Sequence, residues 1–582
     1  MRIKTRLKRP GPRTLVFMCC IFAALVATLP LCRQSLAWAH DLNFQLTRIE
    51  GIYEGLLSGQ FPVRINPTFI NGYGYADPIM YPALFLYFPA IFRLCGMSLL
   101  RSYQLFIFAV NLMTAGLSYA CARRIFKRRD LAVFAMLVYT LCLYRLICIF
   151  TRAAIGELIG MAFLPCVFLG MHELFDGAPH TAPRFLVLGF VGLINCHVLS
   201  ALIAAEACLV IAIVNVRRLF TVQRISALVD SILATLLLTL WVTIPMLHLS
   251  ATNLKFKYSG SIAAQNAVYP FELFATFVRS GGLSGDLDVP YTGMPLSVGG
   301  LLGAGLLVYV YLRLMRPQER SPLGTERAVS GAFALAVTSL FVTSTLFPWD
   351  GVASIPLLGG IITSIQFPWR FLGIASVGLT AVLTYTAARF AGNGLRRNTF
   401  FLVAALLVLF SAAPYLDGYM QDSTRPAVLS PEVTSPNTTM LGAQEYLRRR
   451  TSLDALLERE PEPIGYGVEL TNVSRSYLSF TFDYTGVLGE AAYPSAPYVE
   501  LPLYYYPLYA AKGADGNVYR VTEGNDGVVR VFTGRFNDTV TVSYRAPISY
   551  KIAEILSLTS LLWLTYKYMR DILVGNKFFR KD

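Results

Sequence analysis

Residues 100–122 read LRSYQLFIFAVNLMTAGLSYACA, and Arg123-Arg124-Ile125-Phe126-Lys127-Arg128-Arg129 follow directly. The first stretch is mostly apolar and exceeds the ~18 residues that a helix needs to cross a hydrocarbon core of roughly 30 Å. The second stretch is a basic cluster of the kind that remains on the cytoplasmic side of a membrane. Together they predict a transmembrane helix whose C-terminal end lies inside the cell.

The same pattern recurs along the 582 residues, of which 55% are hydrophobic and 15% are charged. This composition excludes a water-soluble multidomain protein. We predict an α-helical polytopic membrane protein with about twelve transmembrane helices and both termini in the cytoplasm. The predicted spans lie near residues 14–32, 100–122, 131–150, 155–175, 185–199, 200–216, 227–249, 296–312, 328–346, 371–390, 399–416 and 548–570.

The net charge of +15 does not indicate a nucleic-acid partner, because the positive charge is clustered at the ends of apolar runs. Residues 417–547 contain 16 acidic and only 11 basic residues, so the whole basic excess lies outside this segment. All ten cysteines lie between Cys19 and Cys208, mostly in apolar segments. Their spacing predicts neither a disulfide framework nor a CxxC metal site.

Three segments leave the topology open. Residues 79–95 are apolar but short and proline-containing, and a crossing there would place the cluster at 123–129 outside, so we predict that they lie in the membrane interface. The spans 185–199 and 200–216 could instead form a re-entrant hairpin. The first run could be a cleavable signal peptide that ends near Ala37-Trp38-Ala39, but its length favours a retained helix.

With both ends inside, three hydrophilic segments face outward: 33–99, 250–295 and 417–547. We predict a transmembrane module at 1–416 that includes the outer loop 33–99, an extracytoplasmic β-rich domain at 417–547, and a last transmembrane helix with a basic tail at 548–582. The β-rich domain should contain a short helix near Ala443–Leu457 and a small antiparallel sheet or sandwich. Its expected strands include Tyr477–Tyr484, Val518–Val521, Val528–Thr533 and Val540–Tyr544, separated by turn residues such as Asp515-Gly516-Asn517 and Asn525-Asp526-Gly527.

The first outer loop opens with an amphipathic pattern. At 100° per residue, the side chains of Leu42, Leu46, Ile49, Tyr53 and Leu56 form one apolar stripe with a polar flank on each side. This pattern predicts a helix lying on the membrane surface. Asp41 precedes the stripe and is either a helix N-cap, a functional carboxylate, or both.

An aromatic, turn-rich loop follows this helix. It contains Phe61-Pro62-Val63-Arg64-Ile65-Asn66-Pro67 and Asn71-Gly72-Tyr73-Gly74-Tyr75-Ala76-Asp77-Pro78. Glycine, proline and tyrosine favour fixed turns and flat stacking surfaces of the sort that sugars bind, although an ordinary loop has a similar composition.

These features resemble a known family. The sequence is similar to the YfhO-like branch of the C-type glycosyltransferase (GT-C) superfamily, a branch also labelled 6-pyruvoyl-tetrahydropterin synthase-related. The similarity lies in the order of its first features: a basic tail, one span, an outer His-Asp pair that opens an amphipathic helix, and the motifs FPVRINP and GYGY. Later segments agree with this resemblance: Thr151-Arg152-Ala153-Ala154-Ile155-Gly156-Glu157, Asn195-Cys196-His197-Val198-Leu199-Ser200, Gln366-Phe367-Pro368-Trp369-Arg370 and Leu501-Pro502-Leu503-Tyr504-Tyr505-Tyr506-Pro507. The histidines that the pterin chemistry needs for zinc are missing.

The resemblance implies a glycosyltransferase of the plasma membrane that moves a sugar from a polyprenyl-phosphate donor to an envelope glycan or glycolipid on the outer face. Asp41 then matches the general base that takes the proton of the acceptor hydroxyl. Fixed cations would stabilise the phosphate leaving group. The candidate substrate-binding residues are Arg48, Arg64, Tyr73, Tyr75, Asp77, Arg152, Glu157, His197, Gln366 and Arg370. Gln45 stands where many relatives have a second histidine, so we expect no metal and no cofactor.

Structural roles compete with these assignments. Arg152 could simply pair with Glu157, Arg370 could reach lipid headgroups, and His197 could be a structural histidine. At the level of the whole protein, the alternatives are a flippase or transporter of a lipid-linked precursor and a non-catalytic envelope scaffold. We see neither the internal repeat nor the midplane broken helices of many transporters, and the candidate residues gather at the outer ends of spans.

Overall fold

The computed structural model describes residues 11–255, 264–276, 294–315, 325–356, 359–360, 364–441, 444–486, 496–534 and 537–578. Much of the predicted outer segment 250–295 therefore lies outside the described residues. The chain forms two compact units, each of which is assembled from segments that are distant in sequence. Unit 1 comprises Met1–Leu42, Leu100–Ile232 and Tyr258–Thr434, whereas unit 2 comprises Asn43–Leu99, Leu233–Lys257 and Ser435–Asp582.

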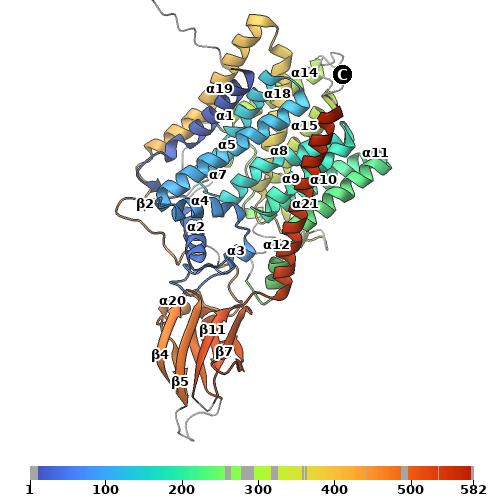
Figure 1. The fold of residues 1–582 in the computed structure, drawn as a ribbon. Helices are drawn as coiled ribbons and strands as arrows, with labels where there is room; N and C mark the ends of the chain where they lie inside the picture. The colour runs from blue at the N-terminus through green and yellow to red at the C-terminus, as the bar shows by residue number, and fades with distance from the viewer. Residues whose placement is uncertain are drawn as a thin grey trace, which may run out of the picture. The chain divides into compact units, whose positions relative to one another are not determined.

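Unit 1 is a helical bundle (Figure 1). Its long helices are α1 (Pro12–Thr28), α5 (Leu99–Phe126), α6 (Arg129–Thr140), α7 (Leu143–Phe150), α8 (Ile155–Phe175), α9 (Ala182–Ile194), α10 (Val198–Val214), α14 (Gly300–Met315), α15 (Glu326–Thr343), α18 (Leu372–Phe390) and α19 (Gly394–Gln421), together with the first residues of α12 (Val222–Ser250). Shorter elements are η1 (Leu29–Leu31), η3 (Pro179–Thr181), α11 (Val216–Leu219), η4 (Glu272–Phe274), α16 (Trp349–Ala353), η5 (Pro368–Phe371) and a small antiparallel pair, β1 (Leu36–Ala37) and β2 (Ala427–Leu429).

The helices confirm a multi-pass membrane protein. Among the described residues, seven helices are long and apolar enough to cross a membrane, and the bent pair α6–α7 makes an eighth. The helices α9, α10 and α14 are apolar but shorter, with 13, 17 and 16 residues. A helix lies at each of the twelve predicted spans, but the number of crossings and the side of each terminus stay predictions.

Small residues allow close packing between α8 and α9. A Cβ atom added at Gly189 would lie 2.5 Å from Val167 Cγ2, and one added at Gly192 would lie 2.4 Å from Phe163. Only glycine fits at these two positions, because any larger residue would force the helices apart. This is the usual way in which helices associate in lipid, where packing replaces the hydrophobic effect.

A buried polar network stabilises the break between α6 and α7. The fully buried Arg145 guanidinium donates to Asn111 Oδ1 at 2.6 Å, Thr114 Oγ1 at 2.9 Å and the Thr140 carbonyl at 3.2 Å. Asn111 in turn donates to Thr28 Oγ1 at 2.9 Å. These bonds give the two terminal nitrogens of the guanidinium partners within the apolar bundle, where an isolated cation is costly.

The helical part of unit 2 begins with α2 (Leu42–Leu57), which confirms the predicted helix of the first loop. The short helices α3 (Asp77–Met80), η2 (Leu84–Leu86) and α4 (Tyr87–Leu94) follow. Phe88, Ile91 and Leu94 are about half exposed, which agrees with an interfacial position for residues 79–95. The last helix, α21 (Ile548–Phe578), packs on α12, where Ser557 Oγ donates to the Leu237 carbonyl and Tyr550 bonds His248.

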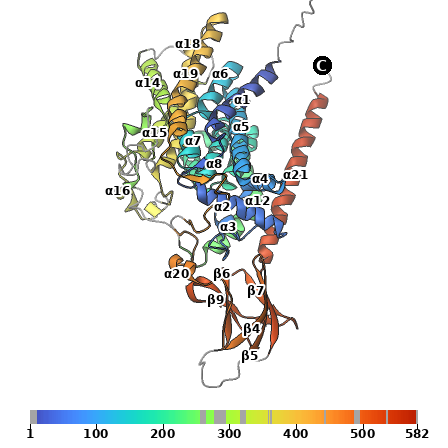
Figure 2. The same cartoon turned by 90° about the vertical axis from the view of Figure 1, so that its left-hand side faces the viewer.

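The rest of unit 2 is a β-sandwich, which confirms the predicted β-rich C-terminal region. A four-stranded sheet has the order β3-β6-β10-β9, and a five-stranded sheet has the order β4-β5-β11-β7-β8. Figure 1 shows β4, β5, β11 and β7 side by side, and Figure 2 shows the two sheets as separate layers. The strands are β3 (Ile464–Tyr466), β4 (Val468–Ser476), β5 (Ser479–Gly486), β6 (Tyr498–Tyr504), β7 (Tyr509–Gly513), β8 (Val518–Tyr519), β9 (Val521–Glu523), β10 (Val528–Phe532) and β11 (Asp538–Tyr544).

The predicted helix near Ala443–Leu457 is mostly wrong. The helix there is α20 (Leu453–Glu458), which Ser452 caps through a bond from the Ala455 N–H. Gln444 and Tyr446 have positive φ angles of 57° and 65°, so the chain before α20 turns instead of continuing as a helix. Tyr446 N–H donates to the Lys255 carbonyl, and this pairing with the segment after α12 replaces the helical bonds.

Candidate active site

Asp41 lies directly before α2, on a segment that the main chain of unit 1 holds in place. The His40 and Asp41 N–H groups donate to the carbonyls of Thr151 and Arg152 at 3.1 and 2.9 Å. Asp41 is exposed, so its carboxylate is accessible to a substrate. The structure thus places the predicted base next to one of the predicted cations.

Arg152 is the centre of a buried cluster in the turn between α7 and α8. Its Nη1 atom donates to Glu157 Oε2 at 2.8 Å and to Tyr144 Oη at 3.1 Å, while Tyr144 donates to Glu157 Oε1. Burial by itself lowers the pKa of Arg152. Nearby groups outweigh this effect and hold the pKa well above its usual range; the largest contribution is the charge of Glu157, followed by Tyr144, Cys148 and Asp41. The guanidinium is therefore permanently charged, and the predicted alternative of an Arg152–Glu157 pair is confirmed.

The segment before α18 contributes a second guanidinium. Arg370 Nη1 donates to the Ile365 carbonyl at 2.6 Å and to Gln366 Oε1 at 3.1 Å. The rings of Phe367 and Trp369 are stacked with centroids 4.4 Å apart, and the Arg152 guanidinium lies 5.8 Å from the Trp369 ring. Gln366, with φ of 66°, thus holds Arg370 beside an aromatic pair that also contacts Arg152.

His197 is the N-cap of α10 and is 7% exposed. Its Nδ1 atom accepts from the Ser200 N–H at 3.2 Å and lies 2.7 Å from Ser200 Oγ. An accepting Nδ1 leaves the hydrogen of the neutral ring on Nε2. Of the three predicted groups Arg152, Arg370 and His197, Arg152 bonds the Glu157 carboxylate directly.

Sequence reasoning missed the residues that position this site. Arg425 is buried and donates to the Trp38 and Phe150 carbonyls at 3.2 and 3.3 Å, while Asp422 pairs with it at 3.0 Å. Thr151 Oγ1 lies 2.6 Å from Tyr415 Oη on α19. Arg425 follows α19 in a polar stretch, and no local sequence signal shows that it reaches segments hundreds of residues earlier.

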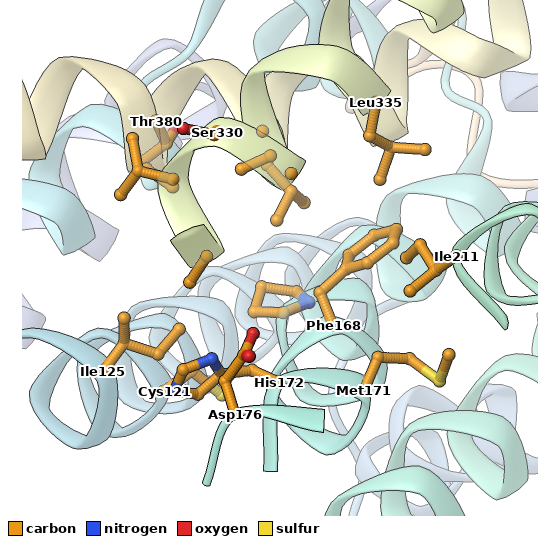
Figure 3. Close-up of a pocket in the computed structure, with 18 of the residues that line it drawn as sticks. Cys121, Ile125, Phe168, Met171, His172, Asp176, Ile211, Ser330, Leu335 and Thr380 are labelled. Atoms are coloured by element: carbon orange, nitrogen blue, oxygen red, sulfur yellow. The ribbon is translucent and has the colours of Figure 1, made fainter. Parts of the chain in front are cut away.

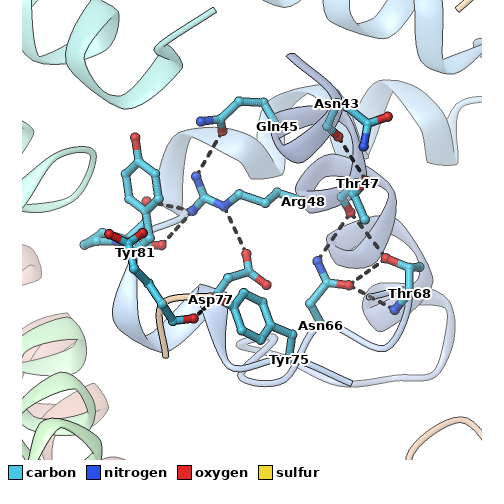
Figure 4. Close-up of polar contacts among 11 residues, drawn as sticks. Asn43, Gln45, Thr47, Arg48, Asn66, Thr68, Tyr75, Asp77 and Tyr81 are labelled. Carbon is cyan, nitrogen blue, oxygen red and sulfur yellow. Dashed lines mark hydrogen bonds and ion pairs between the residues drawn. The ribbon is translucent and has the colours of Figure 1, made fainter. Parts of the chain in front are cut away.

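The predicted residues of the first loop form a separate network within unit 2 (Figure 4). Arg48 Nε donates to Asp77 Oδ2 at 2.9 Å, Nη1 to Gln45 Oε1 at 3.1 Å and Nη2 to the Tyr81 carbonyl at 2.6 Å. Burial raises the pKa of Asp77 to about 6, although the Arg48 charge opposes this shift. The pair fixes the loop to α2, and its contact with substrate stays a prediction.

The three other predicted residues of this loop are also buried inside unit 2. Tyr73 donates to the Glu460 carbonyl at 3.0 Å, and Tyr75 donates to the Glu445 carbonyl. Arg64 pairs with Glu554 of α21 at 2.8 Å and donates to the Trp241 carbonyl of α12 at 3.1 Å. All three connect the loop to the C-terminal part of the unit, so a role in substrate binding remains a prediction for each.

Fold and site together define a multi-pass membrane protein with a carboxylate and a cluster of cations at the ends of its spans. No protein-family model matches the chain. An uncharacterized protein of Lactococcus lactis subsp. cremoris is 22% identical over 186 residues, which cover 31% of this chain and 30% of that protein.

Three solved structures are similar to parts of the chain. Arabinofuranosyltransferase AftD from mycobacteria has 13% identity and a TM-score of 0.44, covering 71% of this chain and 27% of AftD. ArnT from Cupriavidus metallidurans, bound to undecaprenyl phosphate, has 14% identity and a TM-score of 0.36 over 70% of this chain and 76% of ArnT. The Archaeoglobus fulgidus oligosaccharyltransferase has 15% identity and a TM-score of 0.35, covering 70% of this chain and 53% of that enzyme. The chain thus spans less than a third of the Lactococcus protein and of AftD.

Proposed function

We propose that this chain is a membrane glycosyltransferase that moves a sugar from a polyprenyl-phosphate donor to a hydroxyl of an envelope glycan or glycolipid on the outer face of the plasma membrane. The observation that carries this proposal is the pairing of residues 40–41 with 151–152, which sets an exposed carboxylate beside a buried and permanently charged guanidinium. The family resemblance of the sequence supports the same reaction.

The reaction assigns each group a role. The acceptor hydroxyl attacks the anomeric carbon and forms a new C–O bond, while Asp41 takes its proton. The bond from the anomeric carbon to the phosphate oxygen breaks, and its electron pair leaves with the phosphate. Arg152 and Arg370 stabilise the developing negative charge, and the His197 Nε2–H is a further donor.

The buried contacts of the two arginines serve this role because they fix the guanidinium groups before substrate binds. Arg152 is held by Glu157 and Tyr144, and Arg370 is held by Gln366 and the Ile365 carbonyl. Donors that do not need to reorganise stabilise a developing charge more than mobile donors do. The Arg152–Glu157 pair is therefore compatible with catalysis as well as with structure.

A bond-cleavage assay separates this proposal from a flippase. The purified protein in detergent is incubated with a panel of polyprenyl-phosphate hexoses and pentoses, with and without envelope glycan acceptors, and released polyprenyl phosphate is measured. A transferase releases polyprenyl phosphate only with an acceptor present, in an amount equal to the incorporated sugar. A flippase or a scaffold leaves every donor intact, and that result across the panel would refute the proposal.

A further inference from the structure

A second candidate site lies within unit 1, apart from the residues described above. A cavity of about 470 Å³ is lined by residues of α5, α6, α8, α10, α15 and α18 (Figure 3). This volume is within the range of small-molecule pockets. The lining is mostly apolar, as Ile125, Phe168, Met171, Ile211 and Leu335 show. None of the candidate active-site residues contributes to it.

The cavity reaches the end of the bundle that carries the basic clusters. Its lining includes Phe126 and Asp176, at the C-terminal ends of α5 and α8, and Arg327, at the start of α15. Arg123 and Arg124 lie in the last turn of α5. By the positive-inside rule, this end lies in the cytoplasmic leaflet.

Positive charge exceeds negative charge at the mouth of the cavity. Asp176 pairs with Arg218 at 2.9 Å and with Arg327 at 3.8 Å, and the side chain of Arg327 is 66% exposed. Arg313 donates at 2.8 Å to the hydroxyl of Ser330, which lines the cavity. Two guanidinium groups therefore share one carboxylate, and Arg313 adds a third positive charge beside Ser330, an arrangement that favours an anionic head group.

The wall of the cavity also offers a polar atom. His172 lines it, and within the described part of the chain its buried Nδ1 atom has no hydrogen-bond partner. A buried polar atom of this kind is costly unless a ligand or water completes it. Together with the surplus of arginines, it indicates a ligand with a polar anionic part and an apolar part.

We infer that this cavity binds an anionic phospholipid of the cytoplasmic leaflet, with one acyl chain among α8, α15 and α18 and the phosphate among Arg218, Arg313 and Arg327. An apolar space in a helical bundle loses dispersion contacts unless apolar atoms fill it, and lipid chains are the solvent that surrounds these helices. The lipid would stabilise the bundle from the side opposite the proposed chemistry.

Two glycines provide a matched test. Gly331 lines the cavity, and Gly116 does not. A Cβ atom added at either position would meet no atom within 4 Å. Both lie in long helices, so Gly331→Phe and Gly116→Phe are both expected to fold, while only the first fills the cavity. Ala334→Phe, at another lining position, is a second filling variant.

The experiment uses the full chain in nanodiscs that contain phosphatidylglycerol with a photoreactive group in one acyl chain. Mass spectrometry should locate the label on α8 or α15 of the unmodified chain, and Gly331→Phe and Ala334→Phe should lower it about tenfold while Gly116→Phe leaves it unchanged. Unlabelled phosphatidylglycerol should compete better than phosphatidylcholine, and Arg313→Gln with Arg327→Gln should remove that preference.

Equal labelling of the filled and control variants would overturn the inference. So would competition by polyprenyl phosphate but not by phosphatidylglycerol, because the cavity would then hold the carrier lipid. Labelling is independent of sugar transfer, so the outcome does not depend on the function proposed above.

Discussion

The N–H of Asp41 donates to the carbonyl of Arg152 at 2.9 Å, although the two residues belong to segments far apart in the sequence. This bond places the residue before α2 at the turn between α7 and α8. Since Arg425 bonds the carbonyls of Trp38 and Phe150, both segments are fixed from a third side. The main-chain segments that carry the predicted base and one predicted cation are therefore held together.

Arg152→Lys should reduce sugar transfer by about 10²–10³-fold. Lysine keeps the charge but has a single nitrogen, and the bonds that Arg152 Nη1 makes to Glu157 and Tyr144 would occupy it, leaving no second nitrogen for the phosphate. Turnover should fall more than apparent affinity for the donor, and steady-state kinetics with varied donor measure this difference. Arg124→Lys is the matched control, since Arg124 also pairs with a glutamate, Glu173, at 2.7 Å. Equal losses in both variants would assign Arg152 a structural role only.

Arg425→Met should lower both stability and activity. The change removes two hydrogen bonds to the Trp38 and Phe150 carbonyls and the cation that pairs with Asp422, at a cost of about 2–4 kcal/mol. Thermal unfolding in detergent measures the loss of stability, and transfer at a temperature where the variant is still folded measures the positioning effect. Normal transfer by the folded variant would show that Arg425 does not position Asp41.

The Arg48–Asp77 pair should be important for the stability of unit 2. Arg48→Met leaves a buried carboxylate without its cation and should cost about 3–5 kcal/mol. The double variant Arg48→Met with Asp77→Leu should recover much of this loss, because it removes both charges. If the single variant unfolds at the temperature of the unmodified chain, the pair contributes little.

The pH dependence of stability should reveal Asp77. Its pKa rises from 3.8 when unfolded to about 6 when folded, so between these values the folded state holds a proton that the unfolded state has lost. This group should therefore reduce stability as pH rises from about 4 to about 6, by about 3 kcal/mol, and have a constant effect above that. The measurement is the melting temperature of the unmodified chain minus that of Asp77→Asn across this range, and a flat difference would contradict the shift.

Much of the fold could be predicted because local patterns determine it. The apolar lengths located the helices of unit 1, and the stripe from Leu42 to Leu56 located α2. The predicted surface helix has a polar flank on each side, yet Gln45, Thr47 and Arg48 are buried. Arg48 donates to Gln45 and to the Tyr81 carbonyl, and the Thr47 carbonyl accepts from Asn66. Periodicity shows which residues are polar, but it does not show which distant segment will bond them.

The β-sandwich shows the same limit. The strands β5 and β11 alternate apolar and polar residues, β10 is rich in valine, and all three were predicted. By contrast, β6, with the sequence YVELPLY, does not alternate and was not among the predicted strands. Glu500 in β6 is fully buried because Arg459 and Arg530 both pair with it. For the candidate site, Arg152 and Glu157 are close in sequence and were found, but Tyr144, Tyr415 and Arg425 act through tertiary contacts.

The central claim is that Asp41 takes the proton of the acceptor. The decisive measurement is single-turnover sugar incorporation from a polyprenyl-phosphate donor in vesicles containing the unmodified chain, Asp41→Asn or Asp417→Asn. Asp417 is the matched control, because it is also an exposed aspartate. It lies near the end of α19, two residues after Tyr415, which bonds Thr151. We predict that Asp41→Asn inserts normally but loses incorporation by at least about 10²-fold, while Asp417→Asn retains it. Incorporation by Asp41→Asn at the rate of the unmodified chain would contradict the account.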